Sequence, residues 1–416
     1  MPLPVSLSVS PKLMDMETLT QEDDNESAYK RFSFPNEIIQ EIISRLPIKP
    51  ILQFRSVSKH WLSLISHDPC FPKLHFNRSL ATHDRTSFFI SAFDKLTQER
   101  HFLTAPLDGG PVTHLITLHD SHYDDSDAEH LNGLVFFTSR NVPIYGSSGF
   151  VINPATRKVF KVPPPPNRDF PIYFFGFDEF SNEHNILCTC YSSIRHPIAI
   201  GFMIFSLSTG SWRQIPVDLE ELFPRPHIIR RIKHSVCVNS VMYFMLNASY
   251  QILAFHLTTE KFSIINLPQG AIPRELTTRF TRHGRDTRKG NSPFLIIDKG
   301  LLGVVCHDLV METNKIHIWF LQDYVNRVWV RETVMVPESW FDLDFFRRIQ
   351  YYDVHSYVSS CRRLSGDMVN AFILDMKTKS FKLVNFNLVY EFLHSNSVWF
   401  QQIRSYVESV LPLREE

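Results

Sequence analysis

The sequence of 416 residues has no net charge, little glycine and no long hydrophobic run. Lys and Arg together number 43, as do Asp and Glu, so no overall field attracts nucleic acid or a membrane. The first thirty residues lack the apolar core of a secretory signal, and no apolar stretch reaches the roughly 20 residues of a membrane helix. We therefore expect a protein of the nucleus or cytoplasm that binds neither nucleic acid nor membrane.

Cysteine is also scarce, and the familiar catalytic motifs are missing. None of the six cysteines forms a CxxC pair, which favours buried, reduced thiols over disulfides. Cys188 and Cys190 would face the same side of a strand, where core packing is the expected role. The sequence contains no GxSxG, HExxH, P-loop or GxGxxG pattern, so we expect no catalytic residue and no cofactor.

One cluster of histidines and acids resembles a metal site in composition but not in spacing. Its members are His114, His119, His122, Asp124, Asp125, Asp127, Glu129 and His130. Because the spacing fits no standard zinc or calcium site, a solvated loop of mixed charge without a metal is expected.

Composition and length point to a globular chain with more than one part. The hydrophobic fraction is 44% and the charged fraction 21%, which suits a chain with a sizeable core. Residues 1–32 carry six acids and little that could form a core, so we expect a disordered acidic tail. Residues 33–80 and 85–416 differ in texture and are treated as two domains.

Residues 33–67 have the pattern of short amphipathic helices. In the first, the apolar side chains that share one face are Ile38, Ile39, Ile42, Ile43 and Leu46. Ser33 is expected to cap this helix, Pro35 to lie in its first turn and Pro47 to end it. A second helix is expected from Pro50 and a third around Trp61. Three helices this short cannot bury all of that apolar surface among themselves, so part of it needs a partner.

From about residue 85 the sequence turns to short runs of Phe, Ile and Val between polar turns, which is typical of β-strands. One unit recurs: an alternating strand, a polar turn, and a second strand led by an aromatic residue. The recurring aromatic residues are Phe102, Phe160, Trp212, Phe262, Trp329 and Phe381. A period of about 50 residues predicts a propeller-like domain of about six blades. A pair of β-sandwiches, or chance spacing among many aromatic residues, stays an alternative.

The predicted helices coincide with a segment that resembles an F-box. The matching residues are Phe34-Pro35, Ile38-Ile39, Ile42-Ile43, Leu46-Pro47 and Phe54-Arg-Ser-Val-Ser-Lys-His-Trp61, with Phe34 where the family usually has Leu. The resemblance implies docking onto a Skp-type adaptor and, through it, a cullin. It implies that the residues that contact the adaptor or support that surface are Pro35, Ile38, Ile39, Ile42, Leu46, Pro47, Ile51, Leu52, Val57 and Trp61.

Charge agrees with such a partner. Residues 34–80 hold six basic and three acidic residues, which favours an acidic partner surface. The alternative is that these helices form only a cap on the β domain.

The remaining sequence resembles the F-box-associated domain (kelch-like, type 3) of a large plant F-box family. Its phrases here include Leu131-Asn-Gly-Leu134, Asn153-Pro-Ala-Thr-Arg157, Phe175-Gly-Phe-Asp178 and Phe255-His-Leu-Thr-Thr-Glu-Lys-Phe262. Each phrase is weak alone, and their order carries the resemblance. A kelch protein has a Gly-Gly pair in every blade, whereas this chain has one, Gly109-Gly110, so a regular kelch repeat is not expected.

The expected architecture is therefore a small three-helix F-box followed by a large all-β, propeller-like domain, an α+β chain with several domains. The resemblance implies a non-catalytic substrate-recognition subunit of a Skp–cullin–F-box E3 ubiquitin ligase. A propeller enzyme and an F-box scaffold that works outside any cullin ligase are the alternatives.

A basic insertion at 271–290 is the candidate for target recognition. Its basic residues are Arg274, Arg279, Arg282, His283, Arg285, Arg288 and Lys289. Loops on a rigid scaffold often carry recognition, and arginine suits carboxylates and phosphates. Arg279, Arg282, Arg285 and Arg288 are the expected target-binding residues, for an acidic or phosphorylated protein segment. A solvated loop without a partner is the alternative.

Overall fold

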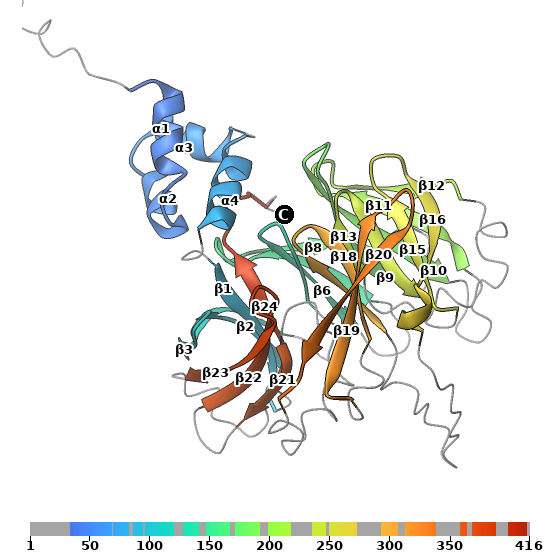
Figure 1. Cartoon of the computed structure of the whole chain (residues 1–416). Helices are drawn as coiled ribbons and strands as arrows, with labels where there is room; N and C mark the ends of the chain where they lie inside the picture. The colour runs from blue at the N-terminus through green and yellow to red at the C-terminus, as the bar shows by residue number, and fades with distance from the viewer. Residues whose placement is uncertain are drawn as a thin grey trace, which may run out of the picture.

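In the described part of the computed structural model, four helices near the N-terminus are followed by 24 strands in six four-stranded sheets (Figure 1). The structure describes residues 34–68, 70–82, 86–94, 96–119, 128–140, 147–166, 171–191, 199–217, 235–246, 249–272, 293–306, 313–337, 358–363, 368–387 and 398–413. Within these residues, the helices are too short and not apolar enough to cross a membrane. The expected order of a small helical domain followed by an all-β domain of about six blades is confirmed.

The helices begin and end close to where the prolines predict. They are α1 (Asn36–Ile43), α2 (Ile48–Phe54), α3 (Lys59–Ser66) and α4 (Phe71–Ala81). Pro35, which was expected inside the first turn after a Ser33 cap, is itself the N-cap residue of α1, and Pro47 is that of α2, with extended backbone at ψ 147° and 159°. Pro50 is the third residue of α2, where a missing N–H costs nothing because the first turn has no internal acceptor. The fourth helix was not expected.

The six sheets follow one another along the chain, and most contain four consecutive strands. The second to fourth are β5 (Glu129–Leu131), β6 (Leu134–Arg140), β7 (Ser147–Asn153), β8 (Lys158–Val162); β9 (Ile172–Asp178), β10 (Glu183–Tyr191), β11 (Ala199–Ser206), β12 (Ser211–Ile215); and β13 (Ser235–Val238), β14 (Val241–Leu246), β15 (Gln251–His256), β16 (Lys261–Asn266). A short 3₁₀ helix, η4 (Gln269–Ala271), follows β16. The fifth sheet is β17 (Phe294–Asp298), β18 (Leu301–Cys306), β19 (Lys315–Asp323) and β20 (Val328–Met335).

The remaining two sheets exchange strands and so close the ring. The first combines β1 (Thr86–Asp94), β2 (Glu99–Pro106) and β4 (Thr113–His119) with the last strand, β24 (Val398–Val407). The sixth combines β21 (Val358–Arg363), β22 (Met368–Asp375) and β23 (Ser380–Asn387) with the two-residue β3 (Gly110–Pro111). First strands of neighbouring sheets contact one another, for example β5 with β9 and β21 with β24, and so surround the centre.

The Gly109-Gly110 pair has a role in this closure rather than in a kelch repeat. Gly109 has φ +91°, and a Cβ there would lie 2.5 Å from the carbonyl oxygen of Asn385 on β23. Glycine therefore allows the β2–β4 connection to reach the sixth sheet, where Val112 donates a backbone hydrogen bond of 3.0 Å to Asn387.

The aromatic repeat corresponds to one hairpin in each sheet, and its aromatic side chains join neighbouring sheets. The hairpins are β1–β2, β7–β8, β11–β12, β15–β16, β19–β20 and β22–β23. Phe160 on β8 stacks on Phe205 of the next sheet with ring centroids 6.1 Å apart. Trp212 on β12 also contacts the preceding sheet, because its indole N–H donates a 2.7 Å hydrogen bond to the carbonyl of Pro163. The period in the sequence is thus the period of the contacts between blades.

The turns of the hairpins in the first, second and sixth sheets share one hydrogen-bond pattern. The side chain at the end of the first strand accepts a backbone N–H from two residues later: Asn153 from Ala155 at 3.0 Å and Asp375 from Lys377 at 2.9 Å. The residue before the second strand has a left-handed backbone, with φ +57° at Arg157. Polar turn residues therefore specify where each blade reverses.

The buried His184 and the half-buried His130 make stability depend on pH. The ring Nε2 of His184 lies 3.1 Å from the carbonyl oxygen of Leu131, which can only accept, so Nε2 carries the hydrogen. Burial lowers the pKa of His184 to about 4. Burial, reinforced by the charge of Arg404, lowers the pKa of His130 to about 3. Both side chains are thus neutral in the folded protein at neutral pH.

We expect the free energy of unfolding to fall below pH 6.5. There the unfolded chain protonates both histidines and the folded protein does not, so each contributes a slope of about 1.4 kcal/mol per pH unit. The loss continues until the pH reaches the folded pKa values of about 4 and about 3. His184→Gln, which keeps a donor towards Leu131, removes about 2 kcal/mol of the loss between pH 6.5 and 5. Urea unfolding at both pH values measures this, with the exposed His119→Gln as control; equal slopes for all three proteins would contradict it.

Candidate protein-binding surface on the helices

A line of apolar side chains on α1 is exposed. Ile38 and Ile42 are four residues apart, so they lie on the same side of the helix. Their exposed fractions are 45% and 51%, whereas the neighbouring Ile43 is buried at 1%. Phe34, one turn before Ile38, is also exposed. The predicted apolar stripe is therefore divided between the core of the helices and solvent, and the exposed part has the character of a protein contact.

The segment from α2 to α3 adds further exposed apolar groups. Pro47, before α2, is exposed, and Val57 in the turn after α2 has an exposed fraction of 64%. Lys49 and Lys59 are exposed near them in the chain. Ile51, by contrast, is fully buried, so it supports the surface and cannot touch a partner in this conformation. Figure 1 shows α4 as the helix nearest β24, with α1–α3 further from the propeller.

Trp61 is half-buried and holds α3 against α2. Its ring centroid lies 5.0 Å from that of Phe54. The backbone N–H of Trp61 donates a 3.2 Å hydrogen bond to the hydroxyl of Ser58, which caps α3. Within the F-box pattern, Ser58 thus caps the start of α3, and Trp61 packs α3 against α2. This capping role of Ser58 was not predicted from the sequence.

Helix α4 is tied to α1 by polar side chains. Arg78 donates a 2.9 Å hydrogen bond to the carbonyl of Glu41, and a second bond to its carboxylate. That carboxylate also accepts from Arg45, and the hydrogen bonds from Arg78 and then Arg45 lower the pKa of Glu41. The buried His75 donates through Nε2 to the carbonyl of Leu46 at 3.1 Å. These contacts explain why the helical unit extends to Ala81.

The structure sorts the ten predicted adaptor-binding residues by exposure. The exposed ones are Pro35, Ile38, Ile42, Pro47 and Val57. The half-buried ones are Ile39, Leu46, Leu52 and Trp61, and Ile51 is buried. The exposed five are the candidates for direct contact, and the other five for support.

The predicted target-binding arginines, Arg279, Arg282, Arg285 and Arg288, lie outside the described residues. Their described neighbours can be placed by topology. The turns β5–β6 and β7–β8 contact Ser409, next to Val410 in the core of the helices, so they lie at the end of the ring that carries the helices. In antiparallel sheets a fourth strand ends, and a first strand begins, at the opposite end. The end of β16 at Asn266 and the start of β17 at Phe294 therefore face away from the helices.

The histidine and acid cluster does not form a site in the described part of the chain. His122, Asp124, Asp125 and Asp127 lie outside it. His114 hydrogen-bonds to Thr117 at 2.8 Å, His119 lies 3.4 Å from Glu99, and Glu129 accepts from the backbone N–H of Phe175 at 2.9 Å. No group of three or more His, Cys, Asp or Glu side chains suited to a metal occurs among the described residues.

The described cysteines give no indication of a reactive thiol. Cys188, Cys237 and Cys306 are buried thiols that form no disulfide, and Cys70 is an exposed one. Burial raises the pKa of Cys237 to about 12, so it is not a thiolate at neutral pH. Cys188 packs in the core as expected.

Comparison with known families identifies the two parts of the chain. The F-box domain matches residues 32–73. The F-box associated beta propeller domain matches residues 80–406, most of the chain. The chain therefore belongs to the F-box associated beta propeller family and carries an F-box before the propeller.

Individual relatives agree with this family. An F-box protein of Arabidopsis thaliana is 26% identical over 362 residues, covering 75% of this chain and 77% of the relative. Another is 24% identical over 336 residues, covering 75% and 66%. Among solved structures, the periplasmic gluconolactonase of Pseudomonas aeruginosa aligns at 11% identity with a TM-score of 0.38, covering 77% of this chain and 99% of the enzyme. A likeness that distant supports no statement about activity.

Ser58→Ala is expected to loosen α3. The substitution removes the hydroxyl that accepts the N–H of Trp61, and loss of such a cap costs about 1 kcal/mol. Backbone amides of α3 should then exchange with solvent about fivefold faster, as hydrogen exchange with mass spectrometry measures. Ser63→Ala, at an exposed position inside the same helix, is the control. Equal protection in both variants would show that the cap has no role.

Proposed function

We propose that this chain is the substrate-recognition subunit of a Skp–cullin–F-box ubiquitin ligase. The observation that supports it most is the exposed apolar line of α1, continued by Pro47 and Val57, in a segment that matches the F-box domain. An apolar helix face of this kind fits the groove of a partner protein. That partner is a Skp-type adaptor, which connects the chain to a cullin.

Charge on the helices favours an acidic adaptor surface. Arg45 and Arg78 are engaged by Glu41. Lys49, Lys59 and Lys73 are exposed, so they add positive charge around the apolar groups. Such rim charges speed association and help to select the partner.

The propeller holds the target in this proposal. The chain contributes no catalytic residue and no cofactor; it raises the effective concentration of a target lysine beside ubiquitin carried by another subunit. The helices lie at one end of the ring, whereas β16 ends and β17 begins at the other. This arrangement supports a target site remote from the adaptor, for an acidic or phosphorylated segment. Nucleus and cytoplasm are the proposed locations.

Reconstitution tests the function directly. The purified chain should bind an Arabidopsis Skp-type adaptor and, with a cullin and its RING partner, form one complex on size exclusion. Binding of the adaptor without the cullin would favour a scaffold that works outside the ligase. Failure to bind the adaptor at all would refute the proposal and reopen the propeller-enzyme alternative.

Ile38→Ala together with Ile42→Ala should weaken adaptor binding without unfolding the helices. Both side chains are about half exposed, so their loss leaves little cavity. Central contacts of an interface typically cost about 2 kcal/mol or more on truncation, roughly thirtyfold in affinity. Calorimetric titration with the adaptor measures the change, and Leu383→Ala, an exposed leucine on the propeller, is the control. Equal affinity of the double variant and the control would exclude α1 from the interface.

Reversing the four arginines of the insertion should abolish target capture. Arg279, Arg282, Arg285 and Arg288 replaced by Glu repel the acidic segment that the native residues would bind. Each exposed contact is worth about 1 kcal/mol or less and weakens with salt, so all four are changed together. Proximity labelling in cells compares the proteins captured by native and variant chains, and adaptor binding is the internal control. An unchanged set of captured proteins would show that the insertion is a solvated loop.

A further inference from the structure

The chain after β24 lies between the helices and the propeller. Val410 is buried in the core of the helices, and Leu413 is buried in the core between the second and third sheets. The helix residues that share a core with Val410 are Ile43, Ile48, Ile51, Ile65 and Phe71. Residues Glu408–Leu413, here called the C-terminal segment, therefore touch both domains.

Asn153, the last residue of β7, holds this segment through the backbone of the segment. Its side-chain amide is buried and donates to the carbonyl oxygens of Ser409 at 3.0 Å and Leu411 at 2.8 Å. Its side-chain oxygen accepts from Ala155 and so shapes the turn. Ala155 in turn packs against the core of the helices. One residue thus organises a junction of turn, segment and helices.

Gly133, in the turn between β5 and β6, makes room for the same segment. A Cβ at Gly133 would lie 2.1 Å from the Cβ of Ser409. Gly300 occupies the same place in the fifth sheet, with φ +75° against +81° at Gly133, and a Cβ there would meet nothing within 4 Å. The turn alone therefore does not require this clearance; the C-terminal segment does.

Chain connectivity alone does not orient the helices. Helix α4 ends at Ala81 and β1 begins at Thr86, which pairs with Val407 at the end of β24. The helices and the C-terminal segment thus leave the propeller side by side. A flexible tether of about four residues would let its ends shift by about 10 Å.

We propose that the C-terminal segment is the element that fixes the orientation of the F-box relative to the propeller. Asn153 and Gly133 are the positioning residues. Asn153 binds the segment by two hydrogen bonds, and Gly133 leaves the space that the segment occupies. Under the proposed function, on which this consequence rests, a fixed orientation sets the distance between a target held by the propeller and the subunit that carries ubiquitin. The coupling itself is measurable without any target.

Two pairs of substitutions separate the contribution of the C-terminal segment from that of the turns it contacts. Asn153→Asp keeps the oxygen that accepts from Ala155 and replaces the amide donor by an oxygen that repels two carbonyls; Asp375→Asn makes the reverse isosteric change in the sixth sheet. Gly133→Ala places a methyl group on Ser409, whereas Gly300→Ala imposes the same backbone strain in open space. Gly300→Ala shares the backbone cost of Gly133→Ala. Asp375→Asn exchanges the same two side chains in a turn of the sixth sheet, where it also removes the charge that pairs with Lys382. Both controls leave the segment unchanged.

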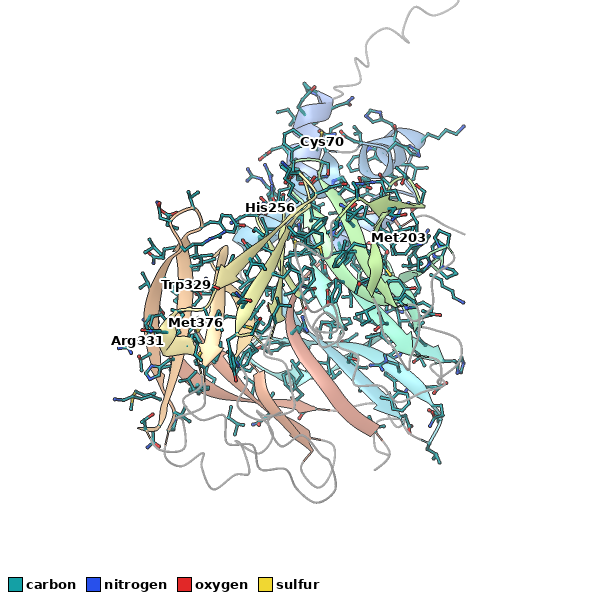
Figure 2. All side chains as sticks on the ribbon, turned by 90° about the vertical axis from the view of Figure 1, so that its right-hand side faces the viewer. Cys70, Met203, His256, Trp329, Arg331 and Met376 are labelled. Carbon is teal, nitrogen blue, oxygen red and sulfur yellow. The ribbon has the colours of Figure 1, made fainter. Side chains whose placement is uncertain are left out.

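Distances between the domains report the outcome. Spin labels on the exposed Cys70 and on Lys261→Cys, next to His256 in the register of β15 and β16, span helices and propeller (Figure 2). Cys190 and Cys361 are replaced by Ser in all chains. Pulsed electron resonance on the full chain should give a narrow distribution for the native protein and both controls. Asn153→Asp and Gly133→Ala should broaden it by about 10 Å while affinity for the adaptor stays unchanged.

Two results would overturn the proposal. Equal widths in all five proteins would show that the segment does not set the orientation. Lost adaptor binding in both Asn153→Asp and Gly133→Ala, but in neither control, would show that the segment belongs to the fold of the F-box instead. Failure of the native chain to bind the adaptor would count against the proposed function alone, because the distances are measured without the adaptor.

Discussion

The pairing of β24 with β1 is the constraint on which the rest of the structure depends. It joins residues 398–407 to residues 86–94, so the first sheet is complete only when both ends of the propeller have folded. Closing so long a loop is entropically costly, and the contacts between neighbouring sheets must offset that cost. Because Thr86 pairs with Val407, the same pairing brings the helices and the C-terminal segment to one place. The site on the helices is therefore held by the closure of the ring.

The sequence predicts the hairpins well because their signals are local. An alternating strand, a polar turn and an aromatic residue such as Phe160 or Trp212 lie within about 15 residues, and the structure confirms one such hairpin in each sheet. Ring closure has no local signal. The pairing of Ile90 with Ile403 depends on residues some 300 positions apart, and Gly109-Gly110 gave no hint that it reaches the sixth sheet.

The residues of the candidate site could be predicted from the sequence, but which of them are exposed could not. Periodicity shows that Ile38 and Ile43 belong to one apolar stripe, but not which of them faces inward, because that depends on the helices packed against α1. Helix α4 was missed because only Phe71 at its start joins the apolar core of the helices, while the rest of the helix is held mainly by hydrogen bonds: Arg78 reaches Glu41, and His75 reaches the carbonyl of Leu46. Hydrophobic periodicity cannot detect a helix that docks through hydrogen bonds.

Differences among the repeats then show where one blade has a partner that the others lack. Asn153 and Asp375 shape their turns in the same way, and a carboxylate serves in the sixth sheet. In the second sheet the other polar atom of that side chain faces two carbonyl oxygens. Because carbonyl oxygens only accept hydrogen bonds, this atom must be the nitrogen of an amide. Gly133 and Gly300 have the same backbone, yet only Gly133 is crowded by another segment. The phrases Leu131–Leu134 and Asn153–Arg157 are therefore more than turns, because each carries a residue whose chemistry is set by the C-terminal segment.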